Sequence, residues 1–211
     1  MEARIEDLTT NQAAIASGVT VAKINRMIDK RILPRRLYST STNRTVRKDA
    51  CLWIAFYFET EDVLTSAARV KAMRGALAHN LSWAELRHCK FDESRTVQVL
   101  LSSIWDDVDR RLSQIKDAQQ MVVEDPEILR GTPVIRGTRI PVRDVASLAG
   151  SGTPMQEILE IYPTLTPHKV ELASIYAKTN PQRGRPRRRS FPNSLIVSVS
   201  QERLRGFSTE G

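Results

Sequence analysis

The sequence is poor in cysteine and has no long hydrophobic run, and these absences exclude several classes of protein. Its 211 residues include two cysteines, Cys51 and Cys89, too few for a disulfide framework, so we expect reduced, structural thiols. The apolar run at residues 52–58 is far shorter than the roughly 18 residues of a membrane-spanning helix. Residues 1–7 contain acids and no apolar stretch, which predicts neither a secretory signal nor a transit peptide. We therefore expect a cytoplasmic protein without a transmembrane segment.

The sequence also lacks the short motifs of common enzyme classes. It contains no Gly-rich phosphate loop, nucleophile elbow or metalloprotease motif. Its three histidines stand apart and lack metal-ligand spacing. Asp106, Asp107 and Asp109 could be read as the metal-binding carboxylates of a nuclease, but adjacent positions on a helix diverge by about 100°. We expect no catalytic activity, no cofactor and no metal.

Positive charge is in excess and is concentrated at both ends of the chain. The sequence has 32 Lys and Arg against 24 Asp and Glu, a net charge of +8, and its pI is about 9.9. Residues 1–50 carry 10 basic and 5 acidic residues, residues 51–178 carry 15 and 17, and residues 179–211 carry 7 and 2. Such an excess is typical of proteins that bind polyanions, although it also occurs on ordinary solvated surfaces.

Residues 10–32 have the pattern of a helix-turn-helix. A short helix is predicted over residues 11–17 with Thr10 or Asn11 as its N-cap, and Gly18 permits a sharp turn after it. A second helix, capped by Thr20, is predicted over residues 21–32. Its apolar stripe consists of Val21, Ile24, Ile28 and Ile32. The long polar side chains outside this stripe would be free to enter a major groove.

Residues 35–47 predict two short strands around a Ser/Thr/Asn turn, which form a basic wing before a further helix. Residues 8–60 thereby resemble the winged helix-turn-helix of MerR-like regulators, except that the aromatic pair usual in their recognition helix is absent. The resemblance implies DNA binding through the second helix and the wing. The candidate DNA-binding residues are Thr20, Lys23, Asn25, Arg26, Lys30, Arg35, Arg36, Arg44 and Arg47. Ordinary surface helices of another small α-domain are the alternative.

The middle of the chain predicts three further helices. Residues 52–58 are apolar almost all round, which favours core packing over a base-stacking platform. A helix is expected over residues 64–78, and Ser82 with Glu85 forms a capping box. One long amphipathic helix is predicted by Val97, Leu101, Ile104, Val108, Leu112 and Ile115. This helix packs between modules or pairs with its copy, and we expect a dimer because helix-turn-helix proteins usually read paired half-sites.

Residues 122–180 combine β-prone segments, two of them around Gly137, with three small helices and their turns. The stretches DPEI at 125–128, GTPVIRGTRIPV at 131–142, EIL at 157–159 and YPTLT at 162–166 closely resemble the domain of unknown function 433. Arg130 departs from that family, which often has a small residue there. The turn is formed by Gly131, Gly137, Thr138, Arg139 and Pro141. The resemblance implies a helix-turn-helix protein of a family in which antitoxins of VapBC-like pairs are common, with PIN-domain ribonucleases as their toxins.

Residues 183–189 contain five arginines together with glycine and proline, which forbid a stable helix. The resemblance to antitoxins implies that these arginines pair with the metal-binding carboxylates of the ribonuclease, and that apolar residues beyond them anchor the arm. The candidate toxin-binding residues are Arg183, Arg185, Arg187, Arg188, Arg189, Phe191 and Leu195. A solvated linker or a nonspecific DNA-binding arm is the alternative, and residues 194–200 also suit a terminal strand of the protein's own fold.

The sequence thus predicts a mainly α protein with two small helix-turn-helix modules, the first one winged with a short β-hairpin, joined by long helices and followed by an extended tail. The expected domains are a winged module at 1–80, connecting or dimerisation helices at 81–120, the second module at 121–180 and a toxin-binding tail at 181–211. With the resemblance, this predicts an antitoxin of a type II toxin–antitoxin system that neutralises a PIN-domain ribonuclease and binds operator DNA to repress its own operon. We expect a homodimer that assembles further with the toxin. A stand-alone MerR-like regulator without a toxin is the alternative.

Overall fold

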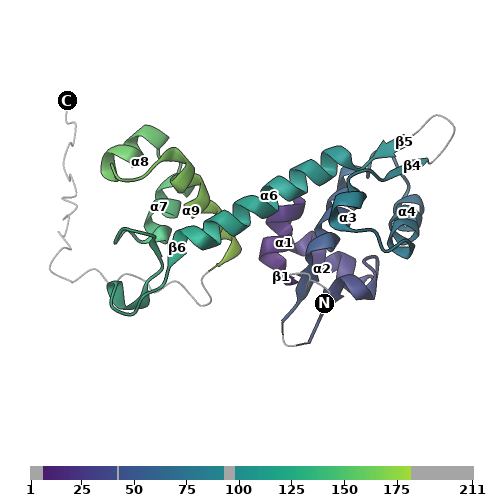
Figure 1. The fold of residues 1–211 in the computed structure, drawn as a ribbon, viewed down its shortest axis with the longest axis horizontal. Helices are drawn as coiled ribbons and strands as arrows, with labels where there is room; N and C mark the ends of the chain where they lie inside the picture. Colours follow the sequence, from purple (N-terminus) through teal and green to yellow (C-terminus); the bar gives the residue numbers. More distant parts are fainter. Residues whose placement is uncertain (1–6, 42, 93–97, 182–211) are drawn as a thin grey trace, which may run out of the picture. The chain divides into compact units, whose positions relative to one another are not determined.

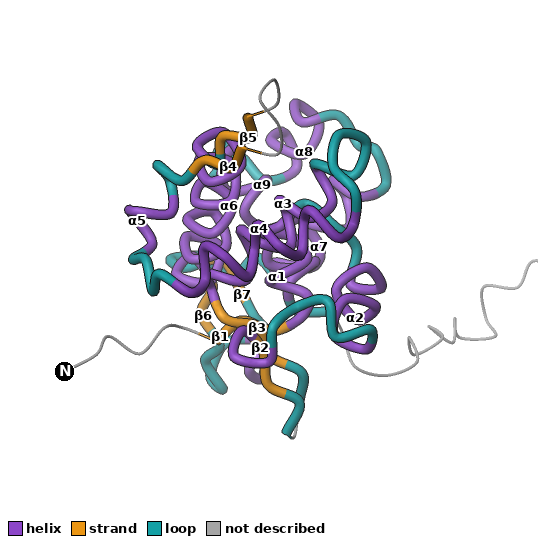
Figure 2. Tube along the Cα trace, turned by 90° about the vertical axis from the view of Figure 1, so that its right-hand side faces the viewer, coloured by secondary structure: helices purple, strands orange, loops and turns teal. Residues whose placement is uncertain are grey.

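The computed structural model of the chain describes residues 7–41, 43–92 and 98–181 (Figure 1). Helices dominate these residues, and the strands, orange in Figure 2, are all short, so the predicted mainly α fold class is confirmed. The chain divides into two units, Met1–Pro181 and Gln182–Gly211. All elements below belong to the first unit, and the predicted tail lies outside the described residues from position 182 onward.

The N-terminal helix-turn-helix is present with small changes to its predicted limits. Helix α1 spans Thr10–Ser17 and helix α2 spans Val21–Asp29. Thr9, and not Thr10 or Asn11, caps α1, because its hydroxyl accepts from the Gln12 amide while the Gln12 side chain accepts from the Thr9 amide. Gly18 then ends α1 at a φ of 67°, a left-handed conformation that glycine adopts without cost. The predicted cap of α2 is confirmed, since the Thr20 hydroxyl accepts from the Lys23 amide.

Helix α2 ends at Asp29, three residues before the predicted end. Arg31 adopts a φ of 54°, and this left-handed residue turns the chain so that the amides of Ile32 and Leu33 both donate to the carbonyl of Met27. Leu33 is thereby buried, at 1% exposure. The buried stripe of α2 consists of Ile24, Met27 and Ile28.

The predicted wing hairpin is confirmed, and the structure adds a third strand to it. Strands β2 (Tyr38–Ser39) and β3 (Thr45–Arg47) pair antiparallel, and β1 (Asp7–Thr9) pairs with the other edge of β3. Val46 lies opposite both Leu8 and Tyr38 and is fully buried. The sheet therefore ties the start of the chain to the wing.

The buried hydrophobic residues between Ala13 and Ile115 form one core, called the first core below. Helix α3 (Lys48–Glu59) supplies eight of them. Trp53 and Phe56 are fully buried with their rings edge-to-face at 6.0 Å, so the prediction that these aromatics pack in the core is confirmed. Helices α4 (Ser66–Ala78) and α5 (Trp83–Leu86) follow, and the capping box of Ser82 and Glu85 opens α5 as predicted. Strands β4 (Lys90–Asp92) and β5 (Gln98–Leu100) then form an antiparallel pair.

The long helix α6 spans Ser102–Met121, so its predicted start at Val97 is wrong. The reason is that the residues directly before the helix form strand β5, which pairs with β4. Ile104, Val108 and Ile115 of α6 are buried in the first core. The predicted stripe is therefore covered within the chain, and this face of α6 is not free to pair with a second copy.

The C-terminal module packs around a second core. It contains strands β6 (Val122–Val123) and β7 (Val134–Ile135), a 3-10 turn at Leu129–Gly131, and helices α7 (Val142–Gly150), α8 (Met155–Ile161) and α9 (Pro167–Thr179). The partner of β7 is β6, while the expected hairpin around Gly137 is reduced to a single bridge between Val134 and Pro141. Ala118 at the end of α6 belongs to this second core, so α6 contributes to both.

The two glycines Gly18 and Gly75 should respond oppositely to replacement by alanine. Gly18→Ala forces a Cβ into the left-handed region and to 2.7 Å from the Arg111 guanidinium, and we expect a loss of about 1–2 kcal/mol in the free energy of unfolding. Gly75 lies inside α4 with no atom within 4 Å of an added Cβ, so Gly75→Ala should gain roughly 0.5–1 kcal/mol. Urea unfolding measures both; equal effects would contradict the assigned backbone conformations.

The two thiols should differ in reactivity. Burial raises the pKa of Cys51 to about 12, so its reactive thiolate is scarce at any pH below that value. Burial also raises the pKa of Cys89, which lies nearer the surface. We expect a thiol reagent at pH 8 to modify Cys89 slowly in the folded protein and Cys51 after unfolding in urea. Rapid modification of Cys51 in the folded state would show that its surroundings open.

Candidate nucleic-acid interface

The outer side of α2 presents two basic side chains with no partner among the described residues. Arg26 and Lys30 are exposed and lie one helical turn apart, which places them on the same side of the helix. Neither side chain forms an ion pair or a hydrogen bond with another described residue. Both can therefore engage an external acceptor without breaking a contact of the protein.

Arg44 of the wing loop reaches back to α2. Its guanidinium donates to the Asp29 carboxylate at 2.7 Å and to the Asn25 side-chain oxygen at 2.9 Å. The side chains of Arg44 and Asp29 remain 40% and 58% exposed, and exposed ion pairs of this kind contribute at most about 1 kcal/mol. Two candidate DNA-binding residues, Asn25 and Arg44, are thus brought together, and these hydrogen bonds connect the wing loop to α2.

Lys23 takes a different position from Arg26 and Lys30. Its ammonium lies 4.5 Å from the centre of the Phe58 ring, a cation–π contact that holds the side chain toward the end of α3. The Thr20 hydroxyl caps α2 by accepting from the Lys23 amide. Both residues border the surface formed by Arg26 and Lys30, but each already has a role within the protein.

The three remaining candidates differ in how far the protein engages them. Arg36 donates to the carbonyl of Leu77 at the end of α4, and Arg47 forms a two-pronged ion pair with Asp49 at 3.1 and 3.2 Å. Arg35 is exposed and makes a single hydrogen bond, to the Thr40 hydroxyl. The geometry therefore assigns Arg36 and Arg47 contacts within the fold and leaves Arg35 donors for a ligand.

Two arginines missing from the sequence-based set, Arg31 and Arg74, lie beside Arg35. All three line one open pocket of about 540 Å³. Arg31 directly follows the candidate Lys30 in the sequence, so it could have been predicted from the sequence as part of the basic surface. Arg74 lies on α4, outside the winged segment, and only the fold brings it here.

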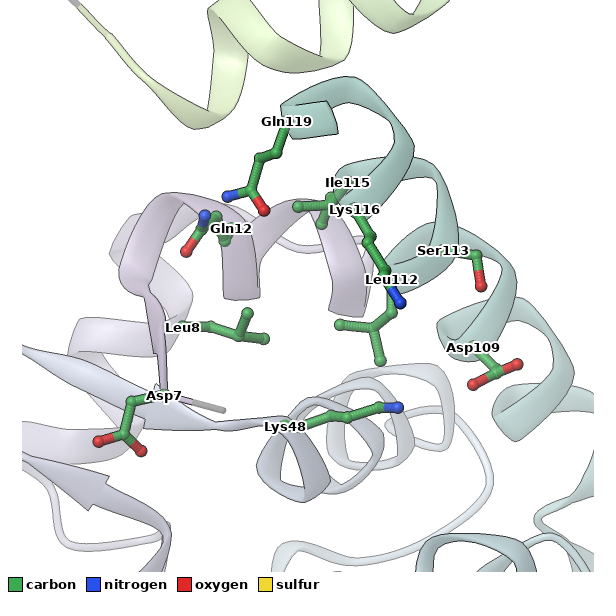
Figure 3. Close-up of a pocket in the computed structure, with 10 residues that line it drawn as sticks. All are labelled: Asp7, Leu8, Gln12, Lys48, Asp109, Leu112, Ser113, Ile115, Lys116 and Gln119. Atoms are coloured by element: carbon green, nitrogen blue, oxygen red, sulfur yellow. The ribbon is translucent and has the colours of Figure 1, made fainter. Parts of the chain in front are cut away.

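A second pocket, of about 400 Å³, lies between β1, α1, the start of α3, and α6 (Figure 3). Its charged lining residues are of both signs: Asp7, Lys48, Asp109 and Lys116. Because acids and bases alternate around it, this pocket has no preference for a polyanion. It is therefore a weaker candidate for contact with nucleic acid.

Asp106, Asp107 and Asp109 of α6 contact three separate groups. Asp106 pairs with Arg87 at 2.8 Å, Asp107 with Arg110 at 2.7 Å, and Asp109 accepts from the Trp83 indole at 2.9 Å. Hydrogen bonds from Arg87 and Arg110 lower the pKa values of Asp106 and Asp107 respectively. Across the described ranges, no group of three or more His, Cys, Asp or Glu side chains is placed to hold a metal ion.

The predicted turn of the C-terminal module is closely bonded. Gly131 and Gly137 have φ values of 79° and 77°, and the Thr138 hydroxyl donates to the Ile135 carbonyl at 2.7 Å. Pro141 precedes α7 as its N-cap. Arg139 is exposed and unbonded among the described residues, whereas its neighbour Arg136 donates to the Gln120 carbonyl at 3.0 Å. The hydrogen bond of Arg136 thus attaches this turn to the end of α6.

The arginine-rich arm cannot be placed in the same way. The candidate toxin-binding residues, from Arg183 to Leu195, all lie outside the described residues. Their assignment stays a prediction from the sequence. In the part of the chain that is described, no helix combines the length and hydropathy of a bilayer crossing.

Comparison with known proteins places the chain in a family. The family described as "Protein of unknown function (DUF433)" matches residues 122–177, the segment built around the turn and α7 to α9. The "Uncharacterized protein y4eO" of Sinorhizobium fredii (strain NBRC 101917 / NGR234) is 41% identical over 208 residues, which cover 94% of this chain and 93% of that protein. The chain belongs to the same family as y4eO. No solved structure matches it.

Substitution of Arg26 and of Arg36 distinguishes an arginine that contacts DNA from one that stabilises the fold. We expect Arg26→Gln to weaken binding to duplex DNA and to reduce the dependence of log K on log salt by about one unit, the effect of one lost phosphate contact. Arg36→Gln should lower the unfolding midpoint and leave that slope unchanged, because its donor serves the Leu77 carbonyl. Fluorescence anisotropy at several salt concentrations and thermal unfolding measure the two. A slope that falls with Arg36→Gln alone would reverse these roles.

Proposed function

We propose that the chain is a DNA-binding antitoxin, whose N-terminal module binds operator DNA and whose C-terminal region neutralises a PIN-domain ribonuclease. The observation that carries the DNA-binding half is the surface of α2 and the wing, where Arg26 and Lys30 are exposed without partners and Arg44 crosses between the two elements. A recognition helix with free long basic side chains, flanked by a basic wing, suits a major groove and its phosphates.

The electrostatics of this surface permit Arg44 to exchange its internal partner for a phosphate. Arg44 holds Asp29 in an exposed pair, so moving its guanidinium to a phosphate costs little and exchanges one charge-assisted hydrogen bond for another. Asp29 would then be an unpaired carboxylate facing the DNA, and its charge would repel phosphates at nonspecific sites. The pair thereby supports selection of a fitted site over nonspecific binding.

The antitoxin half of the proposal is supported by sequence. The segment that matches the family of unknown function, residues 122–177, carries the resemblance to antitoxins, and the arginine-rich stretch at 183–189 has the chemistry to pair with nuclease carboxylates. The proposal includes a cytoplasmic location, no catalytic activity and a dimer. Because α6 buries its apolar stripe within the chain, a dimer has to use another surface.

Removal of residues 182–211 tests the two halves separately. The truncated chain should keep its affinity for operator DNA and lose its inhibition of the ribonuclease encoded in the same operon, measured by cleavage of a labelled RNA. The full-length Arg26→Gln variant is the matched control, because it should lose operator affinity and keep the inhibition. Such a double dissociation would support two functions on separate regions.

The alternative is a stand-alone transcription regulator whose arginine-rich tail is a DNA-binding arm. It is favoured by the basic composition of both ends of the chain. Under this alternative the truncated chain loses DNA affinity and several units of salt slope, and a pull-down with the full chain recovers DNA without a small protein partner. Retained operator affinity after truncation would exclude it.

A further inference from the structure

Three arginines from three different segments meet around one pocket of the first module. Arg31 follows the end of α2, Arg35 opens the 3-10 turn Arg35–Leu37 before the wing, and Arg74 lies on α4. The pocket has a volume of about 540 Å³ and is lined by Arg31, Leu33, Pro34, Arg35, Tyr38 and Arg74. Since no lining residue is acidic, three positive charges share one concave surface.

The fold holds these arginines in place through contacts that leave donors free. Arg36 bonds the Leu77 carbonyl and so fastens the 3-10 turn to the end of α4, which keeps Arg35 beside Arg74. The Arg35 guanidinium lies over the Tyr38 ring at 5.1 Å and donates to the Thr40 hydroxyl. Each guanidinium has five N–H donors, so one such bond leaves Arg35 able to bind a ligand.

Arg31 and Arg74 have no counterion among the described residues. Arg31 is moreover held at a φ of 54°, a conformation that an L-residue other than glycine adopts at a cost. Like charges that converge in this way repel one another, and an anion between them relieves the repulsion. The pocket of Figure 3 differs, because lysines and aspartates alternate around it, whereas three arginines and no acid line the pocket of Arg31.

We propose that the pocket of Arg31, Arg35 and Arg74 binds one phosphate group of the DNA backbone. Planar guanidinium groups bind phosphate oxygens in pairs. The position favours a backbone phosphate over a free ion, because the pocket adjoins Lys30 at the end of α2 and the start of the wing, the two elements assigned to DNA. In naming DNA, the inference rests on the proposed function, and it adds Arg74 of α4 to the binding surface.

The first test uses inorganic phosphate and does not depend on DNA. Thermal unfolding of the full chain is compared in phosphate and in chloride at equal ionic strength, for the wild type, Arg74→Gln and Lys71→Gln. Lys71 is the matched control, because it is exposed on the same helix, loses the same charge and lies outside this pocket. We expect phosphate to raise the midpoint of the wild type and of Lys71→Gln, through binding to the folded state, and to raise that of Arg74→Gln much less. Equal shifts in all three would overturn the anion site.

The second test measures the salt dependence of DNA binding for the same proteins. Arg74→Gln should lower the slope of log K against log salt by about one unit, and Lys71→Gln should not. If the phosphate shift depends on Arg74 while the slope does not, the site takes free phosphate and the DNA assignment is overturned. If the wild type binds no DNA, the proposed function fails, and the thermal shift still reports on the pocket by itself.

A third variant, Arg31→Gly, separates loss of the ligand from loss of the fold. Glycine relieves the left-handed backbone at this position, so the variant should unfold at a higher temperature than the wild type in chloride. It should nevertheless gain less from phosphate and show a smaller salt slope with DNA. A variant that is more stable and yet responds fully to phosphate would remove Arg31 from the site.

Discussion

One helix has to complete two hydrophobic cores, and this constraint organises the described part of the chain. The first module leaves a face of α1 and α3 open, and Ile104, Val108 and Ile115 of α6 cover it. The same helix continues to Ala118, which is buried in the second core with α7 and α9. With 20 residues, α6 is about 30 Å long, enough to reach from one core to the other. Neither core is closed without it.

Helix α6 also contacts the turn between α1 and α2. The Arg111 guanidinium lies against Gly18, at the carbonyl end of α1, where a positive charge is stabilised by the helix dipole. One of its nitrogens is buried without a hydrogen-bond partner among the described residues, and Asp107 lies 3.9 Å from another. Burial raises the pKa of nearby Glu59 in spite of Arg111. The left-handed backbone thus favours glycine at position 18, and an added Cβ would also have to displace the Arg111 guanidinium.

Local patterns in the sequence predicted the helices well, because a period of 3.6 and a capping residue belong to a single segment. The capping box at Ser82 and the cap at Thr20 are examples. Strand β1 escaped prediction because three residues acquire strand character through their partner β3. The start of α6 was predicted too early because the strand β5 before it also depends on its partner, β4. Most of the candidate surface was predicted, but the pairing of Arg44 with Asp29 and the position of Arg74 arise from contacts between distant segments.

The net charge of the chain does not locate its binding surface, because many of its arginines serve the fold. Arg36 and Arg136 donate to backbone carbonyls at helix ends, and Arg47 and Arg87 pair with aspartates. Within the first module, Arg26, Arg31 and Arg74 differ from these, because no described residue satisfies them. An arginine that already has its acceptors loses as much as it gains on meeting a phosphate, whereas an unpartnered one exchanges water alone. The distribution of partners, and not the count of charges, therefore indicates which face of the first module suits a polyanion.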